Sequence, residues 1–147
     1  ILKTVLAKYK KYYDYILVDC GPSLGMLTIN ALTAADSVII PVEAEYLSAK
    51  GMELLLRSVA MTKRKLNPGL KIDGILITRV DKRNNLSRKI IQMVRDAYES
   101  LNIFESQIPE RIAVGKSLSK HELVAGFEKN SDAAIAYKKL AQEVLAK

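Results

Sequence analysis

A short apolar run that ends in an aspartate, Asp19, offers the clearest chemistry in this sequence. The run covers residues 15–18, and a Gly-Pro-Ser turn follows the aspartate after one cysteine. An apolar run of this length bounded by a turn predicts a strand buried in a parallel sheet. Asp19 would then stand at the carboxyl end of the strand, where open α/β sheets bind ligands. A carboxylate there can hold Mg²⁺ beside a phosphate group, although a surface aspartate that merely ends a strand has the same pattern.

The sequence around Asp19 has a long and specific resemblance. Asp-Tyr-Ile-Leu-Val-Asp-Cys-Gly-Pro-Ser-Leu-Gly occupies residues 14–25, and the similarity continues through residues 27–42 toward the C-terminus. This stretch resembles the ParA/Soj-type partition ATPases, which belong with MinD-like proteins to the deviant Walker A class. The resemblance covers the back half of such a protein. It does not include the Gly-rich lysine loop or the first switch of the family.

The resemblance implies roles for individual residues. The aspartate that matches Asp19 helps to hold Mg²⁺, and the turn after it is the second switch. Thr78 and Arg79 correspond to the strand end that meets the adenine. Ile108 and Pro109 correspond to a pair whose neighbouring backbone contacts the purine. A pair of ordinary strand-end loops is the alternative interpretation of these four positions.

A basic stretch in the second half of the chain is the other candidate for binding. Six basic residues fall within residues 79–95, where Asp81 is the one acidic residue before Asp96. The resemblance implies non-specific DNA binding through basic residues of this half, by the ATP-bound dimer. A solvated helix face is the alternative, because charge alone does not specify a ligand. The residues placed to contact phosphates are Lys82, Arg83, Arg88, Lys89 and Arg95.

Other motifs carry little chemistry. Gly115-Lys116-Ser117 has part of a phosphate-loop pattern, but that pattern requires a glycine at position 110, where Glu110 stands. His121 has no ligand set around it, and Cys20 has no histidine placed to activate it. No catalytic residue is therefore predicted.

Composition limits the class of protein. The chain has 147 residues, a net charge of +7 and a single cysteine, and no apolar run approaches the roughly 20 residues that span a bilayer. The length suits one domain over residues 1–147. The lone cysteine fits a reducing cytoplasm, and the excess of basic residues favours polyanions as partners.

Strands and helices alternate along the sequence. Helical spacing of apolar residues predicts helices over residues 1–12, 24–35, 45–66 and 86–101, and a last helix capped by Ser131. Apolar runs predict strands over residues 15–18, 37–42, 72–78 and 103–108. This order predicts an α/β fold with a mainly parallel sheet and flanking helices. The resemblance implies a partial P-loop NTPase fold of the SIMIBI type that lacks the Walker A strand, which leaves the centre of the sheet without its usual strand.

The expected function follows mainly from the resemblance. An intact protein of this kind binds ATP with Mg²⁺, forms a homodimer, coats DNA without sequence preference and responds to a ParB-like centromere-binding protein. It would be cytoplasmic and associated with the nucleoid, with no membrane partner. This chain alone should lack ATPase activity, because it has no lysine-bearing phosphate loop. The alternatives are a non-enzymatic DNA-binding module derived from such an ATPase and a MinD-like positioning ATPase. The Ala-rich residues 137–147 fit the MinD-like membrane helix poorly.

Overall fold

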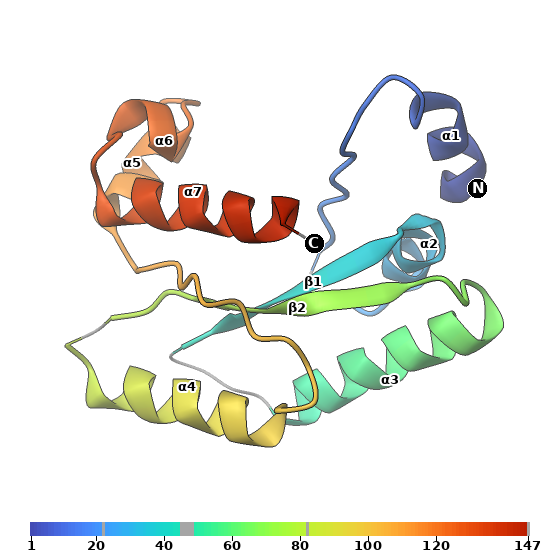
Figure 1. Ribbon diagram of the computed structural model, residues 1–147, viewed down its shortest axis with the longest axis horizontal. Helices are drawn as coiled ribbons and strands as arrows, with labels where there is room; N and C mark the ends of the chain where they lie inside the picture. The colour runs from blue at the N-terminus through green and yellow to red at the C-terminus, as the bar shows by residue number, and fades with distance from the viewer. Residues whose placement is uncertain (22, 45–48, 82, 147) are drawn as a thin grey trace. The chain divides into compact units, whose positions relative to one another are not determined.

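Helices and strands alternate in the structure, a computed structural model that describes residues 1–21, 23–44, 49–81 and 83–146 (Figure 1). The side chains of residues 49, 112, 113 and 118 are not described. Contacts group the chain into two units. Unit 1 comprises Ile1–Val38 and Ser48–Ile72, and unit 2 comprises Ile39–Leu47 and Asp73–Lys147.

Unit 1 contains three helices at positions where the sequence predicts them. They are α1 (Leu2–Tyr9), α2 (Met26–Ala34) and α3 (Ala49–Lys65). The predicted start of the third helix, residues 45–48, lies outside the described residues. Apolar side chains at helical spacing on α2 and α3 bury themselves in one core, which contains Leu32, Val59 and Leu70.

Asn67 holds the ends of two helices of unit 1 together. Its side chain is buried, and its amide donates to the carbonyl oxygens of Leu32 and Ala35 at 3.0 and 2.7 Å. These carbonyls lie at the end of α2, where helices leave acceptors without an intrahelical donor. The bonds therefore fix the turn after α3 against the end of α2.

Two parallel strands continue from unit 1 into unit 2. They are β1 (Ser37–Glu43) and β2 (Lys71–Thr78), and both confirm predicted strands. In unit 1 the Lys71 N–H donates to the Asp36 carbonyl at 3.1 Å. In unit 2 the Ala44 N–H donates to the Thr78 carbonyl at 2.9 Å. The sheet is flanked by helices, so the predicted α/β fold class is confirmed.

The predicted strand over residues 103–108 is wrong in detail. Among the described residues, this segment runs parallel to β2 and to the chain just after it and forms two isolated bridges, Ile75–Ile103 and Val80–Pro109. Phe104 donates to Ile75, and Ile108 donates to Ile77, both at 3.0 Å. Four residues of the segment therefore accompany two residues of β2, which is a bulge. The bulged residues donate elsewhere: the Glu105 and Ser106 N–H groups bind the carboxylate of Glu143 at 2.9 and 2.8 Å.

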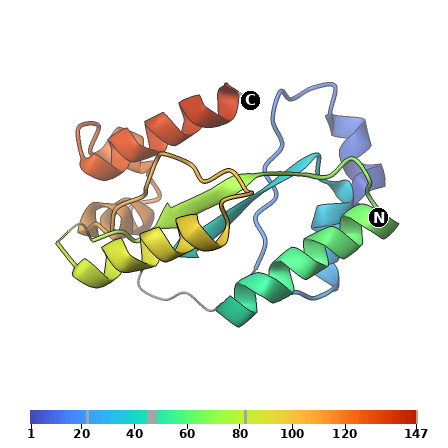
Figure 2. The same cartoon turned by 60° about the horizontal axis from the view of Figure 1, so that its bottom comes forward.

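Helices cover both faces of the sheet in unit 2. The helix α4 (Asn85–Ala97) lies on one face and α7 (Asp132–Leu145) on the other, as both views show (Figures 1 and 2). Both helices are predicted by the sequence, and Ser131 caps α7 by accepting the Ala134 N–H at 3.2 Å. Leu140 of α7 packs on a core that includes Leu76 and Phe104. Two short helices, α5 (Ile112–Ser119) and α6 (Val124–Phe127), are not predicted by the sequence.

The predicted strand before Asp19 does not form. Residues 15–20 have no regular structure, and the Leu17 side chain is 93% exposed. A strand is stable only with a hydrogen-bonded neighbour, and no described segment pairs with this one. The run therefore has the apolar composition of a buried strand, but none of the described segments forms a sheet with it.

Candidate functional site

The chain after β2 lies against residues 108–110, and this contact forms the first part of the candidate site. Val80 N–H donates to the Ile108 carbonyl at 3.0 Å, and Glu110 N–H donates to the Val80 carbonyl at 3.2 Å. Ile108 and Pro109 are both buried, and the Ile108 N–H donates to the Ile77 carbonyl at 3.0 Å. The structure thus brings together the four residues for which base contact is predicted: Thr78, Arg79, Ile108 and Pro109.

Arg79 is the most unusual residue of this group. Its φ is +53°, a left-handed conformation that is uncommon for a residue other than glycine. Its guanidinium contacts the Glu110 carboxylate at 2.8 Å and the Glu43 carboxylate at 3.8 Å. The neighbouring Thr78 hydroxyl donates to the Val42 carbonyl at 3.3 Å. The sequence reasoning missed Glu43 and Glu110, although Glu43 is the last residue of β1 and Glu110 follows the bridge at Pro109, positions where ligand-binding residues concentrate.

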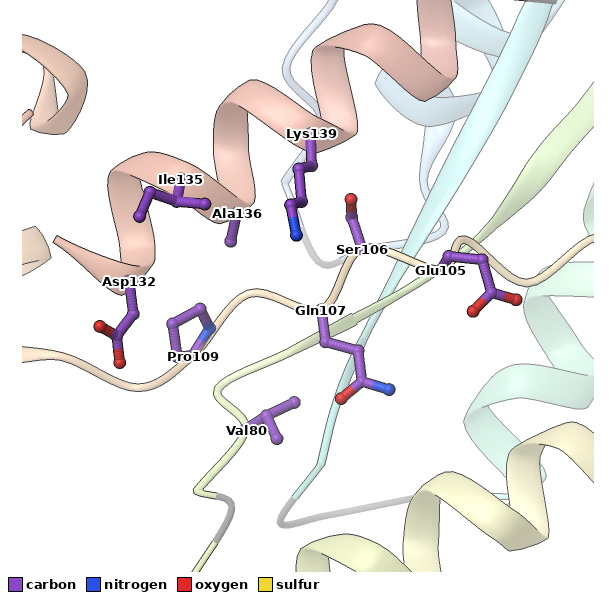
Figure 3. Close-up of a pocket in the computed structure, with 9 residues that line it drawn as sticks. All are labelled: Val80, Glu105, Ser106, Gln107, Pro109, Asp132, Ile135, Ala136 and Lys139. Atoms are coloured by element: carbon purple, nitrogen blue, oxygen red, sulfur yellow. The ribbon is translucent and has the colours of Figure 1, made fainter. Parts of the chain in front are cut away.

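A surface hollow of about 470 Å³ lies between α7 and the segment after Phe104. Figure 3 shows Pro109 and Val80 on one side of it and Ile135 on the α7 side, with Lys139 pointing toward the segment. The Ser106 hydroxyl is buried beside it and has no hydrogen-bond partner among the described residues. The volume falls within the range of small-molecule pockets, which is roughly 300 to 1,000 Å³.

Asp19, the predicted Mg²⁺ ligand, is exposed in unit 1. Pro22, in the turn that follows it, lies outside the described residues. Among the described residues, no group of three or more His, Cys, Asp or Glu side chains is placed to hold a metal ion. The metal role of Asp19 therefore stays a prediction.

The basic residues on α4 form an exposed face, the second part of the candidate site. Arg88 and Lys89 are exposed, whereas Ile90 and Val94 are buried, so one side of the helix packs and the other is free for contact. Arg88 donates to the Asn85 side chain at 2.7 Å. Arg95 is half-buried and lies 3.8 Å from Glu105.

Arg83, in the loop before α4, is another residue that is predicted to contact phosphates. Arg83 donates to the Asp81 carboxylate through its side chain at 3.2 Å and through its backbone N–H at 3.0 Å. The hydrogen bond from the Arg83 side chain, followed by that from its backbone, lowers the pKa of Asp81. The same side-chain bond raises the pKa of Arg83. Lys82 lies outside the described residues.

Gly115-Lys116-Ser117 lies inside α5 and is not a loop. The Ser117 side chain is buried, and its hydroxyl donates to the Val114 carbonyl at 2.9 Å. A phosphate cradle needs a Gly-rich loop whose backbone N–H groups converge on the anion. This motif therefore does not form one.

Comparison with known proteins identifies the family. Residues 1–72 match the profile of a family described as an AAA domain. The chain is 40% identical over 145 residues to the sporulation initiation inhibitor protein Soj of Bacillus subtilis, with 99% of this chain and 57% of Soj covered. It is 36% identical over 144 residues to the chromosome partitioning protein ParA of Myxococcus xanthus, with 98% of this chain and 50% of ParA covered. The chain is a homologue of the ParA/Soj partitioning ATPases.

A solved structure supports the same assignment of the fold. The cobyrinic acid a,c-diamide synthase of Mycobacterium smegmatis superposes with a TM-score of 0.81 at 36% identity, over 98% of this chain and 51% of that chain. That enzyme has also been solved with bound ADP and magnesium and with a bound ATP analog and magnesium. The fold is therefore that of the ParA-related P-loop NTPases.

The chain spans about half the length of the curated relatives that it matches. Its described residues fit a nucleotide with Mg²⁺ only in part. Asp19 lies in unit 1 and the strand end at Thr78 in unit 2, and the described residues include no loop that would hold phosphates. These residues do not by themselves account for a hydrolytic step. Within the same described part of the chain, no helix is both long and apolar enough to cross a bilayer.

Proposed function

We propose that this chain is part of a ParA-like partitioning ATPase that binds DNA without sequence preference through α4. The observation that carries the proposal is the 40% identity to Soj over 99% of the chain, together with the exposed basic face of α4. The intact protein would bind ATP with Mg²⁺ and dimerise. It would associate with nucleoid DNA in the cytoplasm and respond to a ParB-like partner. The homology supports a partitioning role, and the steps of that role are part of the proposal.

Each residue of the predicted nucleotide site has a role in the proposed nucleotide binding. Asp19 would contribute to holding Mg²⁺, and the strand end at Thr78 and Arg79 would contact the base together with Ile108 and Pro109. The bound nucleotide supplies the phosphate whose state the switch after Asp19 senses. The close pairing of residues 78–80 with residues 108–110 supports the base-binding part of this division.

The DNA part of the proposal predicts the effect of reversing two charges on α4. Arg88→Glu with Lys89→Glu should abolish binding of the full-length protein to random duplex DNA, because phosphate contacts supply most of non-specific affinity. Nucleotide binding should be unchanged, since both side chains point to solvent. Fluorescence anisotropy with labelled duplex measures the first property, and calorimetry measures the second. If DNA binding survives the double substitution, the basic face of α4 does not bind DNA and is only a solvated surface.

The metal part predicts the effect of Asp19→Ala in the full-length protein. Loss of a carboxylate that contributes to holding Mg²⁺ should weaken nucleotide binding in the presence of Mg²⁺ more than in EDTA. The matched control is Asp14→Ala, which removes a nearby exposed carboxylate from the same segment. Equal affinities of Asp19→Ala and the parent protein in Mg²⁺ would remove Asp19 from the site.

A further inference from the structure

Most of the net positive charge of the chain lies in unit 1 and not in the unit that carries α4. Unit 1 contains ten basic and four acidic side chains, whereas unit 2 contains thirteen basic and twelve acidic side chains. Unit 1 therefore carries six of the seven net positive charges. A surface potential built in this way raises the local concentration of polyanions and the rate at which they associate. The basic character of the whole chain is thus not explained by α4.

Three segments carry seven of these basic residues, and contacts join the segments at one end of unit 1. Lys10 contacts the Asp36 carboxylate at 2.8 Å, and the Asp36 carbonyl accepts the Lys71 N–H at 3.1 Å. Asn67, two residues after Lys65, donates to the Ala35 carbonyl at 2.7 Å. The ends of α2 and α3 and the starts of β1 and β2 therefore meet here (Figure 1), and the Lys10 side chain, just after α1, reaches Asp36. This surface, the basic end, consists of Lys8, Lys10, Lys11, Lys63, Arg64, Lys65 and Lys71.

The basic end is open to solvent. All seven residues are exposed, and Lys10 is the one that pairs with a carboxylate among the described residues. Lys11 lies 4.8 Å from the ring of Tyr12, which is itself 68% exposed. Basic residues in the last turn of a helix also interact favourably with the helix dipole. That effect suffices for Lys63–Lys65 but not for Lys11 and Lys71, which stand outside helices.

We propose that the basic end is a second polyanion-binding surface whose ligand is the phosphate backbone of duplex DNA. Six of its seven basic residues are lysines, which act as point charges on flexible stems and suit backbone contacts without base readout. The exposed Tyr9 and Tyr12 hydroxyls add donors of the kind that contact phosphate oxygens. This surface consists of unit 1 residues alone and shares none with the α4 face, and the proposal does not rest on nucleotide binding or on α4.

Charge reversal at the end of α3 tests the proposal. Lys63→Glu with Lys65→Glu is compared with Lys3→Glu plus Lys50→Glu, which changes the charge of unit 1 by the same amount at the opposite ends of α1 and α3. Anisotropy with a labelled 60-base-pair random duplex is measured on the 147-residue chain between about 50 and 200 mM salt. Lys63→Gln with Lys65→Gln gives a second, milder variant, and circular dichroism checks that each chain is folded.

The Lys63/Lys65 variants should bind duplex roughly tenfold more weakly at about 50 mM salt, and the slope of log K against log salt should fall by about 2. The Lys3/Lys50 variant should lose less than about threefold. Losses of equal size in the two Glu variants would mean that net charge alone acts, and this would overturn the proposal. Tighter binding to phosphatidylglycerol vesicles or to polyglutamate than to duplex would overturn the choice of DNA. If the α4 variant loses binding while the Lys63/Lys65 variants do not, this proposal fails and the proposed function stands.

Discussion

Single residues set how closely the strands of unit 2 approach the chain beside them. Gly74 of β2 faces Asn102, and a Cβ added at Gly74 would lie 2.5 Å from the Asn102 side-chain nitrogen and 2.8 Å from its carbonyl oxygen. Asn102 cannot move away freely, because its side chain donates to the Asp73 carbonyl at 2.8 Å. Phe104, two residues after Asn102, is buried in the core. The absence of a side chain at Gly74 therefore permits the approach on which the bridge at Ile75 depends.

Gly74→Ala should destabilise the chain. The added methyl group must displace backbone or break the Asn102 bond, and overpacking of this kind costs about 1 to 3 kcal/mol. The free energy of unfolding measured in urea checks this value. Gly126→Ala is the control, because no atom lies within 4 Å of the Cβ it would add, and it should be neutral or slightly stabilising. Equal stability of the Gly74→Ala chain and the parent would contradict the close approach.

Sequence reasoning finds residues that stand at strand ends but not their partners. The resemblance selects Arg79 and Pro109, and each follows an apolar run that predicts a strand. It does not select Glu43 and Glu110, which bind Arg79, because they are distant from Arg79 in sequence and only the folded strands bring them near. The left-handed backbone of Arg79 has no signal in its residue type, since arginine rarely adopts it.

The segment beside β2 shows how one helix shapes an element of the sheet. Residues 103–109 have the composition of a strand, yet the bulge at Glu105 and Ser106 turns two backbone N–H groups toward Glu143 of α7. A carboxylate that accepts two N–H groups makes charge-assisted bonds, which are stronger than neutral ones. The bulge is thus stabilised by a side chain from the last helix, which local sequence cannot reveal.

Glu143→Leu should release this bulge. The two amide N–H groups lose their acceptor, so their hydrogen exchange should accelerate by about tenfold or more, which corresponds to about 1.4 kcal/mol. Exchange followed by NMR at Glu105 and Ser106 measures the effect. Glu128→Leu, an exposed glutamate beyond α6, serves as the control and should leave both amides unchanged. Unaltered exchange in Glu143→Leu would show that the carboxylate is not the acceptor in solution.

Elements with a strong periodic pattern are the ones that the sequence predicts. The helices α1 to α4 and α7 and the strands β1 and β2 satisfy both a local pattern and a tertiary position. The short helices α5 and α6 lack a long apolar stripe, and α6 has four residues, too few for a period to show. The run before Asp19 has the pattern of a strand, but no described segment pairs with it, so the pattern alone predicts a strand that does not form.

At the scale of the whole molecule, the candidate functions are spread over both units. Unit 1 carries Asp19 and the basic end, and unit 2 carries the strand end at Thr78 and the basic face of α4. Large apolar side chains of unit 1 are exposed, among them Leu17, Met26 and Leu27. Exposed apolar residues of this kind are a feature of surfaces that pack against other protein. The chain spans only about half of its relatives, and the phosphate cradle is not found in its described residues.

The most direct test of this account is a calorimetric titration of MgATP into the purified 147-residue chain. The account predicts no binding in the micromolar range, because the Asp19 carboxylate and the strand end at Thr78 lack a loop that holds phosphates. Binding that is micromolar and abolished by Lys116→Ala would contradict it. In that case Gly115-Lys116-Ser117 would form a phosphate site, although it lies within α5.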